Sequence, residues 1–123
     1  MGGYNGGEIA SKMAAESASN YIKSNFQKML ETINERKQKE DNKNIEKDEI
    51  LKLVKSGIQY ANMVVYEEAK KNPELEGMGT TLDVTLIYNN RYILDILETV
   101  GFIELEIKLC VNLQKTIAMC NNY

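Results

Sequence analysis

The first part of the chain contains an amphipathic stretch in which apolar residues recur every three or four positions. It covers residues 8–33, and this spacing places its apolar side chains on one face of a helix. Those positions are Ile9, Ala10, Met13, Ala14, Ala18, Tyr21, Ile22, Phe26, Met29, Leu30 and Ile33. Because Ala10, Ala14 and Ala18 are small, we expect this face to pack closely against a sheet or a second helix.

A nearly all-polar segment, residues 34–48, follows this helix. It predicts a solvated helix end and then a linker, with residues 42–44 as the best break. Its charges alternate in sign, which favours a solvated surface over a binding patch.

A second helix is predicted to begin near Asp48, a suitable N-cap residue. Gly57 interrupts its apolar face and costs about 1 kcal/mol relative to alanine, which indicates a close contact there. The sequence Asn72-Pro73 ends the helix, because the residue before a proline avoids the helical region. Lys70 and Lys71 suit its last turn. The apolar positions are Ile50, Leu51, Val54, Ile58, Ala61, Val65 and Ala69.

The character of the chain changes at residues 72–93, NPELEGMGTTLDVTLIYNNRYI. A loop over residues 74–79 precedes a β-branched, apolar strand over residues 80–88. One strand face carries Leu82, Val84, Leu86 and Tyr88, and the other carries Thr81, Asp83, Thr85 and Ile87. Asn89-Asn90 favours a tight turn, so residues 91–94 are expected to return as a hairpin partner.

These elements predict an α+β fold in which two long antiparallel helices pack on an antiparallel sheet. The tail from residue 95 gives a mixed signal: ILDILETVGF is compatible with a helix start, whereas residues 103–113 alternate as a strand does. Such a strand, if exposed, would be an edge prone to pairing with other chains.

The amino-acid composition narrows the classes of protein to which the chain can belong. A chain of 123 residues has room for one domain, and its net charge of −3 provides no basic footprint for nucleic acid. The start lacks the features of a signal peptide, and no apolar run is long enough to span a membrane. Cys110 and Cys120 have no metal or redox spacing, so reduced thiols and a cytoplasmic location are expected.

Histidine is absent, which excludes serine-histidine and cysteine-histidine catalysis and imidazole zinc sites. Hydrolytic chemistry would then depend on carboxylates, with or without hard metal ions.

Two segments resemble a known family. MGGYNGGEIASKMAAESASNYI resembles the segment that begins inside the D-G-M-G-G motif of the bacterial metal-dependent protein phosphatases (PPM family, type 2C). NPELEGMGTTLDVTLIYNNRYI resembles the loop and strand that carry the family's G-M-G-T-T signature. The family also places two long helices between these segments. The resemblance covers residues 1–93 and identifies them as part of a PPM-type domain.

The resemblance implies a partial four-layer α-β-β-α sandwich. Family members hydrolyse phosphoserine and phosphothreonine in proteins, so the implied partners are phosphoproteins. Aspartates hold two Mn²⁺ or Mg²⁺ ions, and a metal-bridging water attacks phosphorus. Such ions activate the water and neutralise charge on the attacking and leaving oxygens.

The resemblance assigns this chain no catalytic or metal-binding residue. The motif's metal ligands are its aspartate and first glycine, and these would lie before Met1. Gly2 and Gly3 match the end of the motif and shape its loop. The family's next motif, G-D-S-R, is replaced by LDILETVGF, so Asp95 and Glu98 receive no role and are expected to be surface carboxylates. We therefore expect the chain to be inactive alone.

A frame shift accounts for the replacement. Permitted codons for residues 97–108, read two bases in, spell G-D-S-R-V-Y-R-I-R-N-K, and the match continues to Tyr123. The hypothesis is that one base is lost near Asn90-Arg91, so that residues 94–123 are an out-of-frame translation of uncertain fold.

Two alternatives remain. In the first, the chain is a non-catalytic helix-plus-hairpin module for protein–protein interaction that self-associates through an uncovered apolar face. In the second, the chain is a complete domain of new function, which requires the tail to fold.

Overall fold

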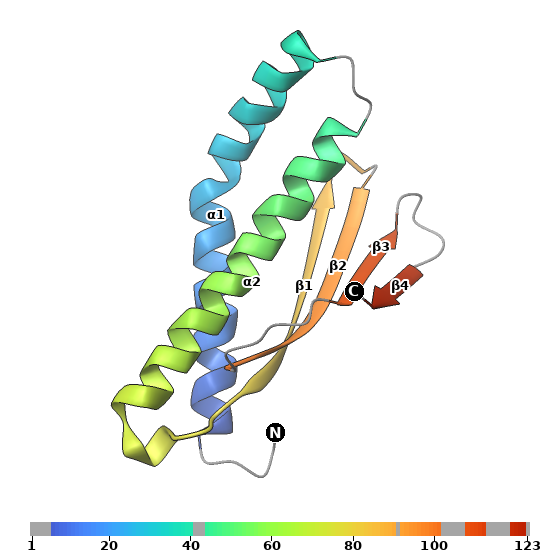
Figure 1. Ribbon diagram of the computed structural model, residues 1–123. Coiled ribbons are helices and arrows are strands. Elements are labelled where there is room, and N and C mark those ends of the chain that lie inside the picture. The colour runs from blue at the N-terminus through green and yellow to red at the C-terminus, as the bar shows by residue number, and fades with distance from the viewer. Residues whose placement is uncertain (1–5, 41–43, 91, 102–107, 113–118, 123) are drawn as a thin grey trace.

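The chain has a mixed α+β fold with two long helices and an antiparallel sheet (Figure 1). The computed structural model describes residues 6–40, 44–90, 92–101, 108–112 and 119–122. Its elements are α1 (Gly7–Lys39), α2 (Ile45–Lys71), a 3-10 helix η1 (Pro73–Leu75), β1 (Thr80–Tyr88), β2 (Tyr92–Val100), β3 (Lys108–Asn112) and β4 (Met119–Asn122). The predicted fold class, an antiparallel helix pair on an antiparallel sheet, is confirmed at this level.

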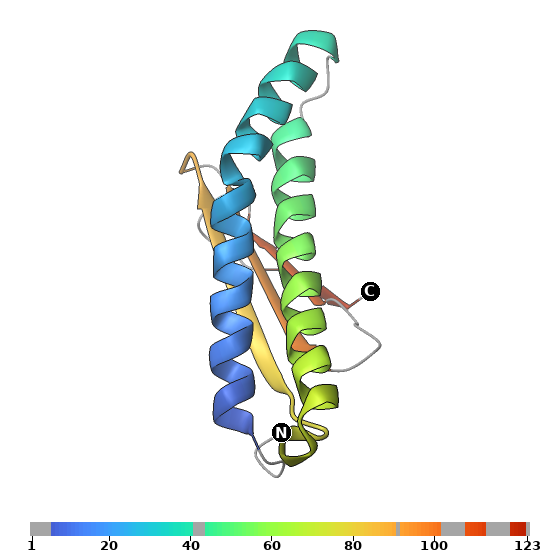
Figure 2. The same cartoon turned by 90° about the vertical axis from the view of Figure 1, so that its left-hand side faces the viewer.

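The helices form one layer and the sheet forms the other. Figures 1 and 2 show α1 and α2 running antiparallel along the same side of the strands. The first helix packs mainly on β1 and the second mainly on β2. The helices therefore cover one face of the β1–β2 hairpin, and the opposite face carries the exposed side chains of Ile87 and Leu97.

The second helix ends where the sequence predicts, but its start needs a correction. The second helix begins at Ile45, three residues before the predicted start at Asp48. The reason is burial: Ile45 is 1% exposed and enters the core, so the first turn forms earlier. The predicted end is confirmed, because α2 stops before Pro73 and the Asn72 side chain accepts a hydrogen bond from the Glu74 N–H, at 3.1 Å.

The first hairpin has the predicted strand and turn. Thr80–Tyr88 forms β1, and Asn89 and Asn90 adopt left-handed φ angles of 54° and 55°. Residue 91 lies outside the described residues, and β2 begins at Tyr92. The register pairs Thr80 with Val100 at one end and Tyr88 with Tyr92 at the other.

The helix start suggested for ILDILETVGF is wrong, because these residues extend β2 to Val100. Pairing with the full length of β1 satisfies their backbone groups and outweighs the ambiguous local pattern. In the tail, a strand was expected over residues 103–113. The structure has β3 at Lys108–Asn112, and residues 102–107 and 113 lie outside its description. The sheet order is β1-β2-β3-β4.

The core lies between the helix pair and the inner face of the hairpin. The predicted small contacts of α1 are buried, with Ala10 and Ala14 at 0% exposure. Gly57 makes the predicted close contact, since a Cβ there would lie 2.8 Å from Cγ1 of Ile22. Fully buried large side chains complete this core: Ile33, Ile45, Ile50, Ile58, Met78, Ile96, Val54, Val65 and Val100.

One predicted core residue is exposed. Ile9 was assigned to the buried face of α1, yet its side chain is 46% exposed. Each residue turns a helix by about 100°, so Ile9 points away from the line through Ala10 and Ala14 that meets the core. Among the described residues, no helix combines the length and apolar character that crossing a membrane requires.

Candidate functional site

Gly6, just before α1, meets the loop before β1 at one end of the molecule. Gly6 precedes α1 with a left-handed φ of 84°. A Cβ at Gly6 would lie 2.8 Å from Cδ2 of Leu75 and 3.3 Å from Sδ of Met78, which belong to the loop before β1. Only glycine combines this φ with this close approach. The loop glycines Gly2 and Gly3 lie outside the described residues.

The loop before β1 is held by short-range hydrogen bonds and by the end of β2. The Met78 N–H donates to the Leu75 carbonyl at 3.0 Å, and Met78 is fully buried. Gly101 packs on this loop so closely that a Cβ there would lie 2.6 Å from the Met78 carbonyl oxygen. The Gly101 N–H donates to Oδ1 of Asn62 at 2.7 Å, which fastens the end of β2 to α2.

An open pocket of about 700 Å³ lies beside this loop, between the end of α2 and Gly101. The Tyr66 ring and Pro73 line it, and Nζ of Lys70 stands 5.4 Å from the centre of the Tyr66 ring. Glu76 contributes a carboxylate. Among the described residues, the pocket lining offers an aromatic wall, one ammonium and one carboxylate, and these residues contain no nucleophile–base pair of the kind that covalent catalysis needs.

A pair of carboxyl groups lies on the outer face of the sheet. Asp83 on β1 and Asp95 on β2 share a hydrogen bond, and Oγ1 of Thr85 donates to Oδ1 of Asp95 at 3.0 Å. The hydrogen bond with Asp95, together with partial desolvation and the neighbouring charge, raises the pKa of Asp83 from 3.8 to about 6. Asp83 therefore retains its proton in mildly acidic solution.

Asp95 and Glu98 were both expected at the surface, and this is wrong for Glu98. Glu98 lies opposite Leu82 in the register and is 7% exposed. Residues of a strand alternate between its faces, so Glu98 shares the helix-covered face of β2 with Ile96 and Val100. Its Oε1 accepts a hydrogen bond from the Thr99 N–H at 3.2 Å. Asp95 is half-buried on the opposite face.

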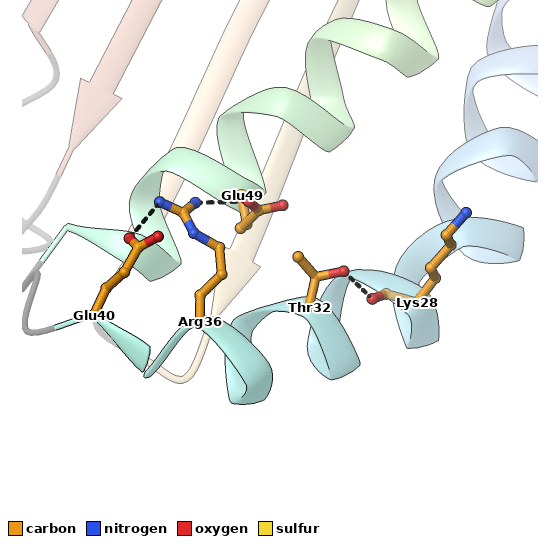
Figure 3. A network of polar contacts seen from close by, with 5 residues as sticks. All are labelled: Lys28, Thr32, Arg36, Glu40 and Glu49. Atoms are coloured by element: carbon orange, nitrogen blue, oxygen red, sulfur yellow. Dashed lines mark hydrogen bonds and ion pairs between the residues drawn. The ribbon is translucent and has the colours of Figure 1, made fainter. Parts of the chain in front are cut away.

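Charged residues at the other end of the molecule join the two helices (Figure 3). Nη1 of Arg36 lies 2.7 Å from Oε1 of Glu49 on α2, and Nη2 lies 3.1 Å from Oε2 of Glu40. These hydrogen bonds raise the pKa of the Arg36 guanidinium. Lys37 and Glu46 form a second ion pair between the helices. This network ties the end of α1 to the start of α2, which is an architectural role.

The described residues do not fit a Mn²⁺ or Mg²⁺ centre. They contain no group of three or more histidine, cysteine, aspartate or glutamate side chains placed to hold a metal ion. Asp83 and Asp95 supply two carboxyl groups, whereas hard ions take about six oxygen ligands. This pair of carboxyl groups therefore does not support a metal-dependent step.

Comparisons with known proteins found no relative of this chain. A scan against models of protein families matched none, and neither a curated protein nor a solved structure matched the chain.

Sequence reasoning missed the pairing of Asp83 with Asp95. The alternation of β1 had placed Asp83 on the face opposite Leu82, and in the structure Leu82 is buried and Asp83 is exposed. Asp95 gave no such signal, since its segment was compatible with a helix start. A hairpin register carried past residue 94 would have set Asp95 beside Thr85 and brought the two carboxyl groups together.

Proposed function

We propose that this chain is a section of a PPM-type protein phosphatase, and that the activity to which it belongs is hydrolysis of phosphoserine and phosphothreonine in proteins. One observation carries the proposal. Gly6 and Met78, from the two segments that resemble family motifs, are 72 residues apart in sequence and pack against each other. Motif segments of one catalytic domain are expected to converge in this way.

The fold is compatible with this origin. A helix pair covers one face of the β1–β2 hairpin, and side chains such as Ile87 are exposed on the other face. In the proposed domain, a second sheet covers that outer face and completes the α-β-β-α sandwich. Under this proposal, the Mn²⁺ or Mg²⁺ ligands belong to parts of the domain outside the described residues, and the protein works in the cytoplasm on phosphoproteins.

A restored reading frame tests this proposal. One base is inserted after the codon for Asn90, and the protein is expressed with the codons that lie upstream of Met1 at the locus. We expect Mn²⁺-dependent hydrolysis of p-nitrophenyl phosphate and of a phosphothreonine peptide, lost when the restored D-G-M-G-G aspartate is changed to asparagine. A well-folded restored protein without metal-dependent turnover would contradict the proposal.

The second candidate is a non-catalytic interaction module. It is favoured by the burial of β2 beyond the predicted hairpin, residues 91–94, since Ile96 and Val100 enter the core. Residues 92–101 thus belong to one packed unit with the helices. A module with an uncovered face is expected to associate with itself or a partner in the absence of metal. Sedimentation velocity at several protein concentrations, with and without Mn²⁺, measures this; a monomer at all concentrations would count against self-association.

A further inference from the structure

Among the described residues, β1 is an edge strand. The sheet order places β2 on one side of it and no other described strand on the other. Alternate residues of an edge strand point their backbone N–H and C=O groups outward, where they can accept a further strand. Natural edge strands often carry lysine or proline to prevent this, and the sequence of β1, TTLDVTLIY, carries neither.

A groove of about 410 Å³ runs along this edge between β1 and α1. On the helix side it is lined by Ala15, Ser19 and Lys23, all exposed, with Ile22 and Ala18 deeper. On the strand side it follows the backbone from Leu82 to Ile87. Figure 2 shows β1 passing behind α1, and the two elements are in contact.

The spacing of the helix residues suits a strand. Ala15, Ser19 and Lys23 are four residues apart, so they lie on one face of α1 with a rise of about 6 Å between neighbours. Alternate residues of a strand are about 6.7 Å apart and point the same way. Every second side chain of an added strand would therefore meet one of these three residues in turn.

We propose that the groove between β1 and α1 binds an extended peptide segment of a partner protein, which adds to the sheet as a further strand antiparallel to β1. This inference deepens the interaction-module function by naming the partner's chemistry, and it does not depend on phosphatase activity. Main-chain hydrogen bonds to β1 supply affinity, and the helix residues supply selectivity.

The three helix residues define the sequence of the partner. The short Ala15 side chain leaves room for an aliphatic residue, Ser19 offers a hydroxyl to a small polar residue, and the Lys23 ammonium attracts a carboxylate. Both α1 and β1 run from the end of the molecule where Gly6 meets Met78 (Figure 1). An antiparallel segment therefore has the order acidic, any, small polar, any, aliphatic from its N-terminus.

A second copy of the chain is the competing occupant of this edge. Two β1 strands from different copies can pair edge to edge, as β1 and β2 do within one chain. Pairing of two copies depends on protein concentration alone, whereas binding of a partner segment depends on the concentration of that segment. Protection of the β1 amides on adding peptide therefore distinguishes the two occupants.

The test uses the full chain and a peptide with the core Glu-Thr-Ser-Thr-Val flanked by threonines, with its ends blocked. We expect saturable binding by isothermal titration calorimetry. In ¹⁵N NMR we expect slower hydrogen exchange at alternate amides of β1, because only the edge-facing groups gain a partner. The reversed peptide, Val-Thr-Ser-Thr-Glu, should bind more weakly.

Three variants separate this site from other surfaces. Ser19→Trp fills the groove and should abolish peptide binding, while Asn20→Trp, at the neighbouring exposed position outside the groove, should leave binding unchanged. Lys23→Glu should lower the affinity for the peptide about threefold, as expected for one exposed ion pair. A peptide with lysine in place of glutamate should recover that affinity. Circular dichroism confirms that each variant folds.

Equal binding of the forward and reversed peptides, or no binding by the folded chain, would overturn the inference. Binding that survives Ser19→Trp and leaves the β1 amides unprotected would also overturn it, while leaving a docking function on another face intact. Protection of the same amides that depends on protein concentration alone would assign the edge to a second copy instead.

Discussion

Asp83 and Asp95 occupy diagonal positions on neighbouring strands, where their shared hydrogen bond makes the hairpin sensitive to pH. The pKa of Asp83 is raised from 3.8 to about 6 in the folded chain. The folded state therefore binds this proton more tightly than the unfolded state does. The stabilisation is fully present below pH 3.8 and is lost as the pH rises through about 6.

Asp83→Asn tests this effect, because asparagine cannot lose a proton. The free energy of unfolding of the original chain should fall relative to that of the variant between pH 4 and pH 7, by at most about 1 kcal/mol because Asp83 is exposed. Urea titrations across this range measure the difference. Glu67→Gln, at an exposed position of α2, is the control and should track the original chain. Parallel curves for Asp83→Asn and the original chain would contradict the assignment.

At the scale of single residues, sequence predicted most contacts that depend on a regular element. The alternation of β1 and the close contact at Gly57 follow from periodicity, and both are confirmed. Burial of Glu98 was missed, because its face depends on the register of β2 with β1. Exposure of Ile9 was missed because its position is one residue from the buried line of α1.

The contact between the two helices depends on Gly57. A Cβ there would lie 2.8 Å from Cγ1 and 3.1 Å from Cδ1 of Ile22. Alanine gains about 1 kcal/mol of helix propensity over glycine, but overpacking at a tight contact costs about 1–3 kcal/mol. We expect Gly57→Ala to destabilise the chain by about 1 kcal/mol in urea titrations. Ile22→Val in the same background should recover part of the loss, and a stabilised single variant would refute the contact.

The second strand was the element that sequence predicted least well. Its residues mix helical and strand spacings, and only pairing with the nine residues of β1 decides between them. If β2 is packed as described, Ile96→Ala should cost about 2–5 kcal/mol, because Ile96 is fully buried. Leu97→Ala is the matched control: Leu97 is 45% exposed, so its loss should be much smaller. Equal effects of the two substitutions would show that β2 is not packed in this register.

At the scale of the whole molecule, the described residues lack a metal-binding group of three or more suitable side chains. We expect the purified chain to show no Mn²⁺-dependent hydrolysis of p-nitrophenyl phosphate. Its melting temperature should also not change with Mn²⁺, because a ligand stabilises only a folded state that binds it. Calorimetry and a colorimetric assay check the two outcomes. Clear metal-dependent turnover would place the metal ligands within this chain.

The fold class was predictable at this scale, because two long amphipathic helices and a β-branched hairpin leave few ways to bury their apolar faces. The edge groove was not predictable. It depends on how α1 lies along β1, and the polar or small residues Ala15, Ser19 and Lys23 give no periodic apolar signal.

The nucleotide sequence of the locus tests the proposed origin most directly. The proposal predicts Asp-Gly codons in register immediately upstream of Met1, and G-D-S-R when the codons of residues 97–108 are read two bases in. The same shifted frame should remain open through the codon of Tyr123. An intact frame whose shifted codons do not spell G-D-S-R would contradict the frame shift, and the additional absence of Asp-Gly codons upstream of Met1 would contradict the phosphatase origin.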